Sequence, residues 1–272
     1  MKIGQLWRKQ KASCIALAVL VIIIAAAIAA PLVYNDGPLA MNAVQRLQGP
    51  SSLHLLGTDE YGRDVLSRTC YGIRISMFIG LIVVLLSTIS GIAVGLLCGY
   101  YPAADRIISR ILDGLMAFPE IILAITLAAI WGAGTGNIIF ALTFAYFPKM
   151  ARVVRGSVLA AKEQEYVLSG KAAGASTAHL IRRYILPGCL SPIIVQATFC
   201  FASAVLSEAA LSFLGVGIKE PAPSLGNMVS VGRSFMTIAP WIILAPGGTI
   251  MLMVLALNIL GDGLRDAFDP KY

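Results

Sequence analysis

The chain has 272 residues, of which 58% are hydrophobic and only 13% are charged, whereas an ordinary soluble domain has about 25% charged residues. This composition excludes a soluble globular domain and indicates a protein that is embedded in a membrane. The formal net charge of +7 is not gathered into a basic patch, so nothing in the sequence indicates a nucleic-acid partner.

Long apolar runs give the number of membrane helices, because a helix needs roughly 20 mainly apolar residues to cross the hydrocarbon core. Uncharged runs, and longer runs that few charges interrupt, predict an all-α polytopic membrane protein with a single transmembrane domain, 1–272. The glycine-rich stretch GAGTG, residues 132–136, separates the third helix from the fourth. We expect six transmembrane helices at about 13–33, 76–101, 115–133, 138–156, 188–215 and 238–260.

The first of these helices could instead be a secretory signal peptide. It follows the basic start KIGQLWRKQK and contains the small residues AAAIAA, which would suit a cleavage site. The apolar run from Cys14 to Val33 is longer than the usual signal core of about 7 to 15 residues. We therefore expect an uncleaved first helix.

The stretch before the second helix, residues 54–76, reads HLLGTDEYGRDVLSRTCYGIRIS and is rich in charge. Its acidic residues come mostly before its arginines, which is the order that a helix dipole favours. The acidic residues are Asp59, Glu60 and Asp64, and the arginines are Arg63, Arg68 and Arg74. Apolar residues at helical spacing from Val65 to Ile73 predict an interfacial helix on the outer membrane surface.

The orientation follows from the basic residues, because loops on the cytoplasmic side carry the excess of Lys and Arg. With both termini in the cytoplasm, fifteen of the 21 basic residues lie in inner segments and six in outer segments. We therefore expect both termini in the cytoplasm. Under this topology His54 and His179 lie on opposite sides of the membrane and cannot share a metal ion.

The longest cytoplasmic loop, about 157–187, joins the fourth helix to the fifth. Ser176 or Thr177 can cap a short helix there, and Pro187 should end it near Ile185 because the residue before a proline avoids the helical region. A helix of about two turns is marginal in water, so it needs a partner surface. Gly174 would permit a left-handed turn or a close backbone approach just before it.

This loop resembles the signature loop of bacterial ABC importer permeases, in which Glu-Ala-Ala is followed by three residues, Gly, nine residues, Ile, any residue and Leu-Pro. The Gly, Leu and Pro match Gly174, Leu186 and Pro187. Residues 168–170, Leu-Ser-Gly, replace Glu-Ala-Ala, and Tyr184 replaces the Ile. The resemblance implies a coupling helix that docks in a groove on a separate ATPase subunit, formed by Gly174, Ala175, Ser176, Thr177, Ala178, His179, Leu180, Ile181, Arg182 and Arg183.

Three further stretches are similar to the C-type permeases of the dipeptide, oligopeptide and nickel subgroup. They are residues 54–76, residues 208–228 (EAALSFLGVGIKEPAPSLGNM) and the ending GDGLRDAFDPKY. The resemblance implies a type I ABC importer permease fold in a bacterial inner membrane. It also implies a homologous second permease subunit, two ABC ATPase subunits, a solute-binding protein outside the membrane, and transport by alternating access. Di- or oligopeptides and nickel chelates both remain open as substrates.

The chain has no nucleotide-binding loop of the pattern GxxxxGK followed by Ser or Thr, since Gly170-Lys171 is followed by Ala172. We expect no enzyme activity, no catalytic residue and no cofactor in this chain, with ATP and Mg²⁺ bound by the partner ATPase subunits. The five cysteines are odd in number and form no CxxC pair. No metal site is expected.

Glu208 is the one charge in the run from Tyr184 to Ile218. A carboxylate inside a membrane helix usually faces a cavity or a partner, which makes Glu208 a candidate pathway residue. A structural role, as a hydrogen-bond partner of a neighbouring helix or a residue near the outer end, is the alternative.

Two other function classes are weaker. A proton-coupled secondary transporter could also use a membrane carboxylate, but paired broken helices in corresponding halves, frequent in that class, are not found. An intramembrane hydrolase would need a nucleophile with a base in reach, yet both histidines lie outside the expected helices.

Overall fold

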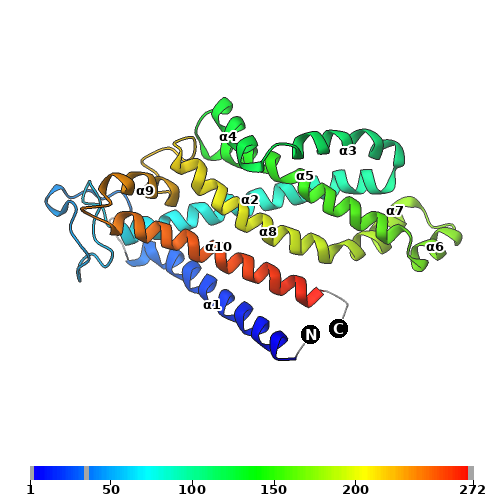
Figure 1. Ribbon diagram of the computed structural model, residues 1–272, viewed down its shortest axis with the longest axis horizontal. Coiled ribbons are helices and arrows are strands. Elements are labelled where there is room, and N and C mark those ends of the chain that lie inside the picture. Colours follow the sequence, from blue (N-terminus) through cyan, green and yellow to red (C-terminus); the bar gives the residue numbers. More distant parts are fainter. Residues whose placement is uncertain (1–2, 34–36, 269–272) are drawn as a thin grey trace.

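The computed structural model describes residues 3–33 and 37–268, and within these ranges the chain forms helices and loops with no β-strand. It is an elongated bundle (Figure 1), which confirms the predicted all-α class. The long helices are α1 (Ile3–Val33), α2 (Val65–Tyr100), α3 (Pro102–Met116), α4 (Glu120–Trp131), α5 (Thr135–Lys162), α8 (Leu186–Phe213) and α10 (Trp241–Phe268). The short ones are η1 (Ala43–Gln45), α6 (Glu165–Ala172), α7 (Thr177–Leu180), η2 (Ile181–Ile185), α9 (Leu225–Gly232) and η3 (Arg233–Phe235).

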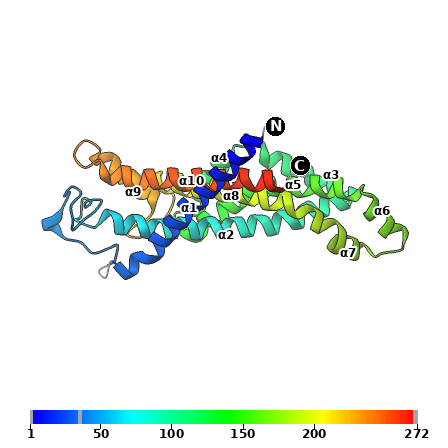
Figure 2. The same ribbon diagram turned by 90° about the horizontal axis from the view of Figure 1, so that it is seen from below.

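Different elements form the two ends of the bundle. Residues 37–64 and α9 form one end, which we call the 37–64 end, and α6 and α7 form the other, the α6–α7 end (Figure 1). The core consists of α2, α5, α8 and α10, while α1 packs along α10 and α2. Figure 2 shows α1 crossing the other helices obliquely.

The closest helix pair, α2 and α5, meets along a row of glycines. An added Cβ atom at Gly91, Gly95 or Gly99 would lie 2.5–2.6 Å from side-chain carbons of Met150, Val154 and Val158. Helices in lipid gain contact chiefly by close packing, and small residues let their backbones approach. The glycines therefore fix the separation of α2 and α5.

In the part of the chain that the structure describes, four helices are long and apolar enough to span a membrane, and a fifth span exists if the bent pair α3 and α4 counts as one. The four are Lys11–Ala30 within α1, α2, the continuous helix Thr177–Phe213, and α10. The fourth expected span, 138–156, falls on α5, which is long enough, but this part of α5 carries three basic residues, Lys149, Arg152 and Arg155. The count of six stays a prediction.

The third expected span, 115–133, is not one straight helix. It covers the end of α3 and all of α4, which bend by 87° at the break before Glu120. Pro119 lies at that break, and the residue before a proline avoids the helical region. The proline therefore divides this part of the chain into two helices.

The expected interfacial helix before the second span is wrong. Residues from Val65 onward form the first turns of α2, which runs unbroken to Tyr100. Asp64 caps this helix by accepting a hydrogen bond from the Ser67 N–H at 2.7 Å, and Val65 is buried against α9 and α10. The apolar face expected to meet lipid thus meets other helices.

The expected helix end near Ile185 is also wrong. The chain is helical without interruption from Thr177 to Phe213, with one π-helical turn at Ile181–Ile185. Pro187 follows this turn directly. The Leu186 N–H closes the turn by donating to the Ile181 carbonyl, so the hydrogen-bond pattern of the helix changes just before the proline, which has no N–H to donate.

Candidate functional site: a polar groove and an exposed helical end

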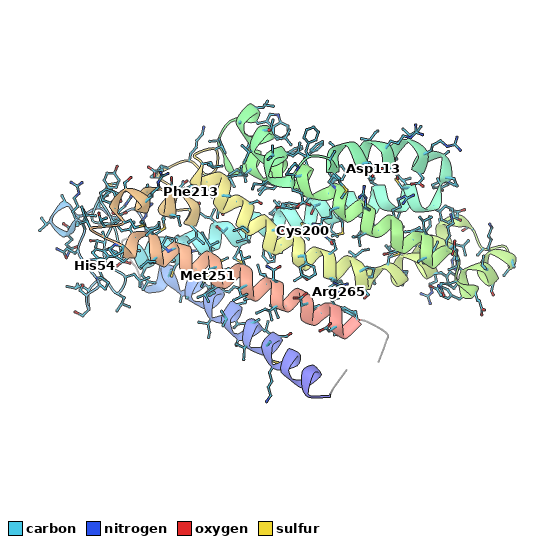
Figure 3. The ribbon with its side chains drawn as sticks, in the orientation of Figure 1. His54, Asp113, Cys200, Phe213, Met251 and Arg265 are labelled. Carbon is cyan, nitrogen blue, oxygen red and sulfur yellow. The ribbon has the colours of Figure 1, made fainter. Side chains whose placement is uncertain are left out.

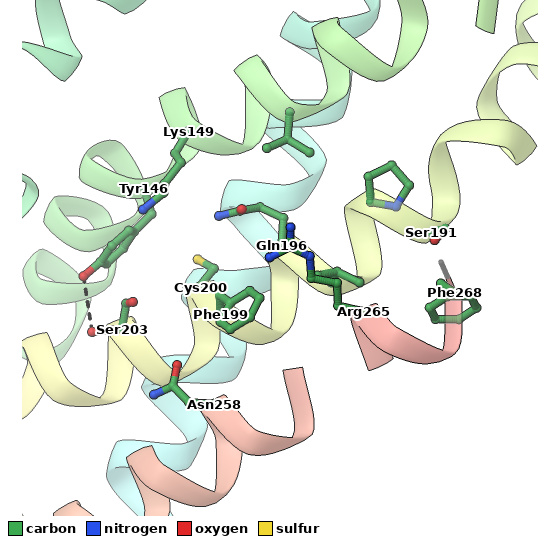
Figure 4. Close-up of a pocket in the computed structure, with 13 residues that line it drawn as sticks. Tyr146, Lys149, Ser191, Gln196, Phe199, Cys200, Ser203, Asn258, Arg265 and Phe268 are labelled. Atoms are coloured by element: carbon green, nitrogen blue, oxygen red, sulfur yellow. Dashed lines mark hydrogen bonds between the residues drawn. The ribbon is translucent and has the colours of Figure 1, made fainter. Parts of the chain in front are cut away.

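A groove of about 730 Å³ lies between α5, α8 and α10 (Figure 4). Its lining includes six charged or polar residues: Lys149, Ser191, Gln196, Ser203, Asn258 and Arg265. Such a volume is ordinary for a small-molecule pocket. Since lipid chains cannot hydrogen-bond to these side chains, the groove suits a polar occupant or a second protein surface.

Helical spacing brings these residues to one side. Residues 192, 196 and 200 of α8 follow one another at intervals of four, as do 191, 195, 199 and 203, and such residues share one face of a helix. Asn258 and Arg265 are seven apart on α10, so they also share a face. Amides and cations on membrane helices often mark a functional surface, and these residues are not among the site residues predicted from the sequence.

Lys149 has a carboxylate neighbour outside the groove lining. Its Nζ atom lies 3.3 Å from a carboxylate oxygen of Glu120 on α4, and the two side chains are 51% and 36% exposed. An ion pair as exposed as this contributes about 0–1 kcal/mol. Lys149 is therefore free to exchange this partner for another anion.

Glu208 does not line the groove, because its side chain is fully buried between α2, α8 and α9. Its carboxylate accepts hydrogen bonds from Ser76 at 2.5 Å, Ser212 at 2.8 Å and Ser224 at 3.1 Å. These donors satisfy the carboxylate inside the bundle. The contacts favour the structural alternative, and the pathway role stays a prediction.

The ten residues of the proposed coupling helix lie at the α6–α7 end. Gly174 has φ +78, the left-handed region that favours glycine, and Ser176 caps α7 by accepting from the His179 N–H. Arg182 and Arg183 are exposed together with residues 176–179, whereas Leu180 is buried.

This end is attached firmly to the bundle. Ile181 and Tyr184 pack on a buried cluster that contains Val158, Val167 and Ile185. The hydroxyl of Tyr100, at the end of α2, donates to Thr177 at 3.4 Å. The short helix is therefore anchored to α2, α5 and α8 on one side and exposed on the other.

The charged stretch at the 37–64 end forms a buried ion network rather than a helix surface. Asp59 accepts backbone hydrogen bonds from Tyr61 and Arg63 and pairs with the Arg63 Nε atom at 2.5 Å. Arg68 approaches the same carboxylate at 3.5 Å. Burial raises the pKa of the nearby Glu60 carboxyl. The network joins the loop to the start of α2.

The two histidines do not meet. The His54 ring is 2.8 Å from Asp64 at the 37–64 end (Figure 3), while His179 packs beside Tyr184 at the α6–α7 end. Within residues 3–33 and 37–268, no group of three His, Cys, Asp or Glu side chains could hold a metal ion.

Comparisons with known proteins agree with this arrangement. Residues 91–272 match the family described as binding-protein-dependent transport system inner membrane component. A Brucella suis protein named as a peptide transport system permease is 46% identical over 257 residues, covering 94% of this chain and 87% of that protein. The dipeptide transport system permease protein DppC of Alkalihalophilus pseudofirmus is 44% identical over 265 residues, covering 97% and 87%.

The fold has a solved counterpart in the MetNI methionine ABC transporter, described in inward facing conformations. The TM-score is 0.58 with 21% sequence identity, and the match covers 72% of this chain and 94% of that chain. The family match spans most of the chain and the curated relatives span nearly all of it. The chain therefore belongs to the binding-protein-dependent transport system inner membrane components and is a multi-pass permease subunit of an ABC importer of the peptide family.

Proposed function

We propose that this permease subunit carries small peptides inward across the membrane by alternating access, after a solute-binding protein delivers them. The polar groove between α5, α8 and α10 is the observation that carries the proposal, since its volume of about 730 Å³ suits a di- or tripeptide. The names of the two curated relatives, which refer to peptide and dipeptide transport, support this substrate class.

The groove is open along one side of a single chain, so a homologous second permease subunit would close it. Two ABC ATPase subunits would dock at the α6–α7 end, through residues 174–183, and would bind the ATP and Mg²⁺. This chain itself would hold no cofactor and carry out no hydrolysis. The exposed side of α7, with Arg182 and Arg183, supports that docking surface.

Both termini would face the cytoplasm. The first residues of α1 and the last residues of α10 point toward the α6–α7 half of the bundle (Figure 1), where Lys162, Lys171, Arg182 and Arg183 lie. This excess of basic residues is typical of a cytoplasmic face. The 37–64 end would then face outward, toward the solute-binding protein.

The test is reconstitution of the chain with its second permease and ATPase subunits in proteoliposomes. ATP and peptide-loaded binding protein should together drive uptake of radiolabelled dialanine, and omission of either should abolish it. A nickel chelate is the second substrate arm, and nickel uptake without dialanine uptake would reject the peptide assignment. Peptide movement by this chain alone, driven by a pH gradient, would indicate a proton-coupled secondary transporter instead.

A further inference from the structure

We propose that the groove selects the C-terminal carboxylate of its peptide, which Lys149 and Arg265 bind. This inference rests on the proposed function, because it names the part of the substrate that the groove recognises. The two cations come from different helices, α5 and α10, and both line the same groove (Figure 4).

The charge of the lining is one-sided. Of the 13 residues drawn around the groove, two are basic and none is acidic. Opposite charges attract and like charges repel, and both effects become stronger when a bound ligand displaces water from the groove. The groove therefore attracts an anion and repels an unpaired cation such as a peptide's free amino terminus.

Both cations are available to a ligand. Lys149 makes only the exposed pair with Glu120, which costs little to exchange. Arg265 is exposed, and among the described residues no hydrogen-bond or ion-pair partner of its guanidinium is found. A guanidinium can bind a carboxylate through two parallel hydrogen bonds.

The rest of the lining suits the body of a peptide. The Asn258 Nδ2 atom donates to the Val254 carbonyl of its own helix at 2.9 Å, which leaves the side-chain oxygen to accept from a peptide N–H. Gln196 can both donate and accept, and its side chain is drawn between Lys149 and Arg265 in Figure 4. Phe199 and Val195 supply apolar contact for a substrate side chain.

The experiment compares two substrates that differ only at the carboxyl end, dialanine and dialanine amide. Each is loaded on one preparation of binding protein, and uptake is measured with the complete reconstituted transporter. The preference of the binding protein is the same for every permease variant, so a change in the uptake ratio reports on the permease. Lys149→Gln and Arg265→Gln are the test variants.

Each test variant should lower dialanine uptake about tenfold, the loss expected for one charge-assisted hydrogen bond, while amide uptake stays near the wild-type rate. Arg152→Gln is the matched control. Arg152 lies three residues from Lys149 and is 50% exposed, but it pairs with Asp113 on α3 and does not line the groove. It should leave the ratio unchanged.

Complex yield and binding-protein-stimulated ATPase activity separate this inference from its alternatives. If both substrates lose uptake equally, or if the complex fails to assemble in both test variants, the cations bind acidic residues of the second permease and the inference is overturned. An unchanged ratio overturns it too. Failure of the wild-type complex to move either substrate would instead reject the proposed peptide transport.

Discussion

Glu208 on α8 and Ser76 on α2 are joined by a hydrogen bond of 2.5 Å in the interior of the bundle. Ser224, directly before α9, donates to the same carboxylate. One side chain thus connects three helices, and each of its partners is a hydroxyl that needs an acceptor when buried. The carboxylate positions α9 against α2 and α8 and does not line the groove.

Replacing Glu208 with Gln should weaken this junction. The amide keeps one acceptor oxygen but presents an NH₂ donor to hydroxyls that now donate to the carboxylate, so a buried polar group loses its partner at a cost of about 1–3 kcal/mol. We expect a lower thermal unfolding midpoint in detergent, with complex yield and peptide uptake falling together. Ser191→Ala, a change at the groove, is the control for yield.

A different result would support the predicted pathway role of Glu208. If Glu208→Gln complexes assemble at the wild-type yield and unfold at the wild-type temperature but transport poorly, the carboxylate acts in translocation. The two readouts must therefore be taken from one preparation.

The glycine row on α2 gives a prediction about stability. A Cβ atom at Gly95 would lie 2.6 Å from the Val154 Cβ and 2.7 Å from the Ala151 carbonyl oxygen, so Gly95→Ala should push α2 and α5 apart. Overpacking of this kind costs about 1–3 kcal/mol. The measurement is the unfolding midpoint by fluorescence-detected size-exclusion chromatography after heating.

Gly114→Ala is the matched control for that variant. Gly114 is an exposed glycine within α3, and nothing lies within 4 Å of an added Cβ atom. Alanine there should be neutral or stabilising by up to about 1 kcal/mol, because glycine is a poor helix former. Equal destabilisation by both substitutions would show that the α2–α5 contact is looser than described.

The all-α class could be predicted from the sequence because an apolar run of hydrocarbon length can satisfy its backbone in lipid only as a helix or a closed barrel. The course of α2 could not be predicted in this way. Val65 and Ile73 carry an apolar pattern that fits lipid as well as it fits protein, and only the position of α9 and α10 decides between them.

The groove was missed for a related reason. Gln196 and Asn258 are single polar residues in long apolar runs, and they lie 62 positions apart in the sequence. Only the packing of α8 beside α10 brings them to one surface. Glu208 could be identified as a candidate site residue because it is charged, yet its serine partners on α2 and before α9 could not be identified from spacing alone.

The proposed orientation predicts which positions can be labelled from outside the cell. Lys219 lies in a loop and Thr135 is the first residue of α5; both are exposed at places expected to face outward, and Lys171 is exposed at the α6–α7 end. In a background without the five native cysteines, Lys219→Cys and Thr135→Cys should react with an impermeant maleimide in intact cells. Lys171→Cys should react only after lysis, and its labelling in intact cells would invert the topology.

Gly174→Glu should uncouple the transporter. Gly174 adopts φ +78, which strains any side chain with a Cβ atom, and the new carboxylate would lie beside the surface where the ATPase is expected to dock. An unpaired charge buried in that contact costs about 3–5 kcal/mol, enough to lower the affinity by a factor of 100 or more, by the rule of about 1.4 kcal/mol per tenfold. The membrane helices should still assemble, because nothing lies within 4 Å of an added Cβ atom at this position.

The matched control is Gly174→Asn, since asparagine tolerates the left-handed region and adds no charge. The measurement is ATPase binding to the purified permease pair in detergent, together with peptide uptake by cells. Gly174→Asn should retain most of both, and Gly174→Glu should lose both while keeping the yield of the permease pair. Wild-type ATPase binding and uptake by Gly174→Glu would show that residues 174–183 form an exposed loop without a docking role.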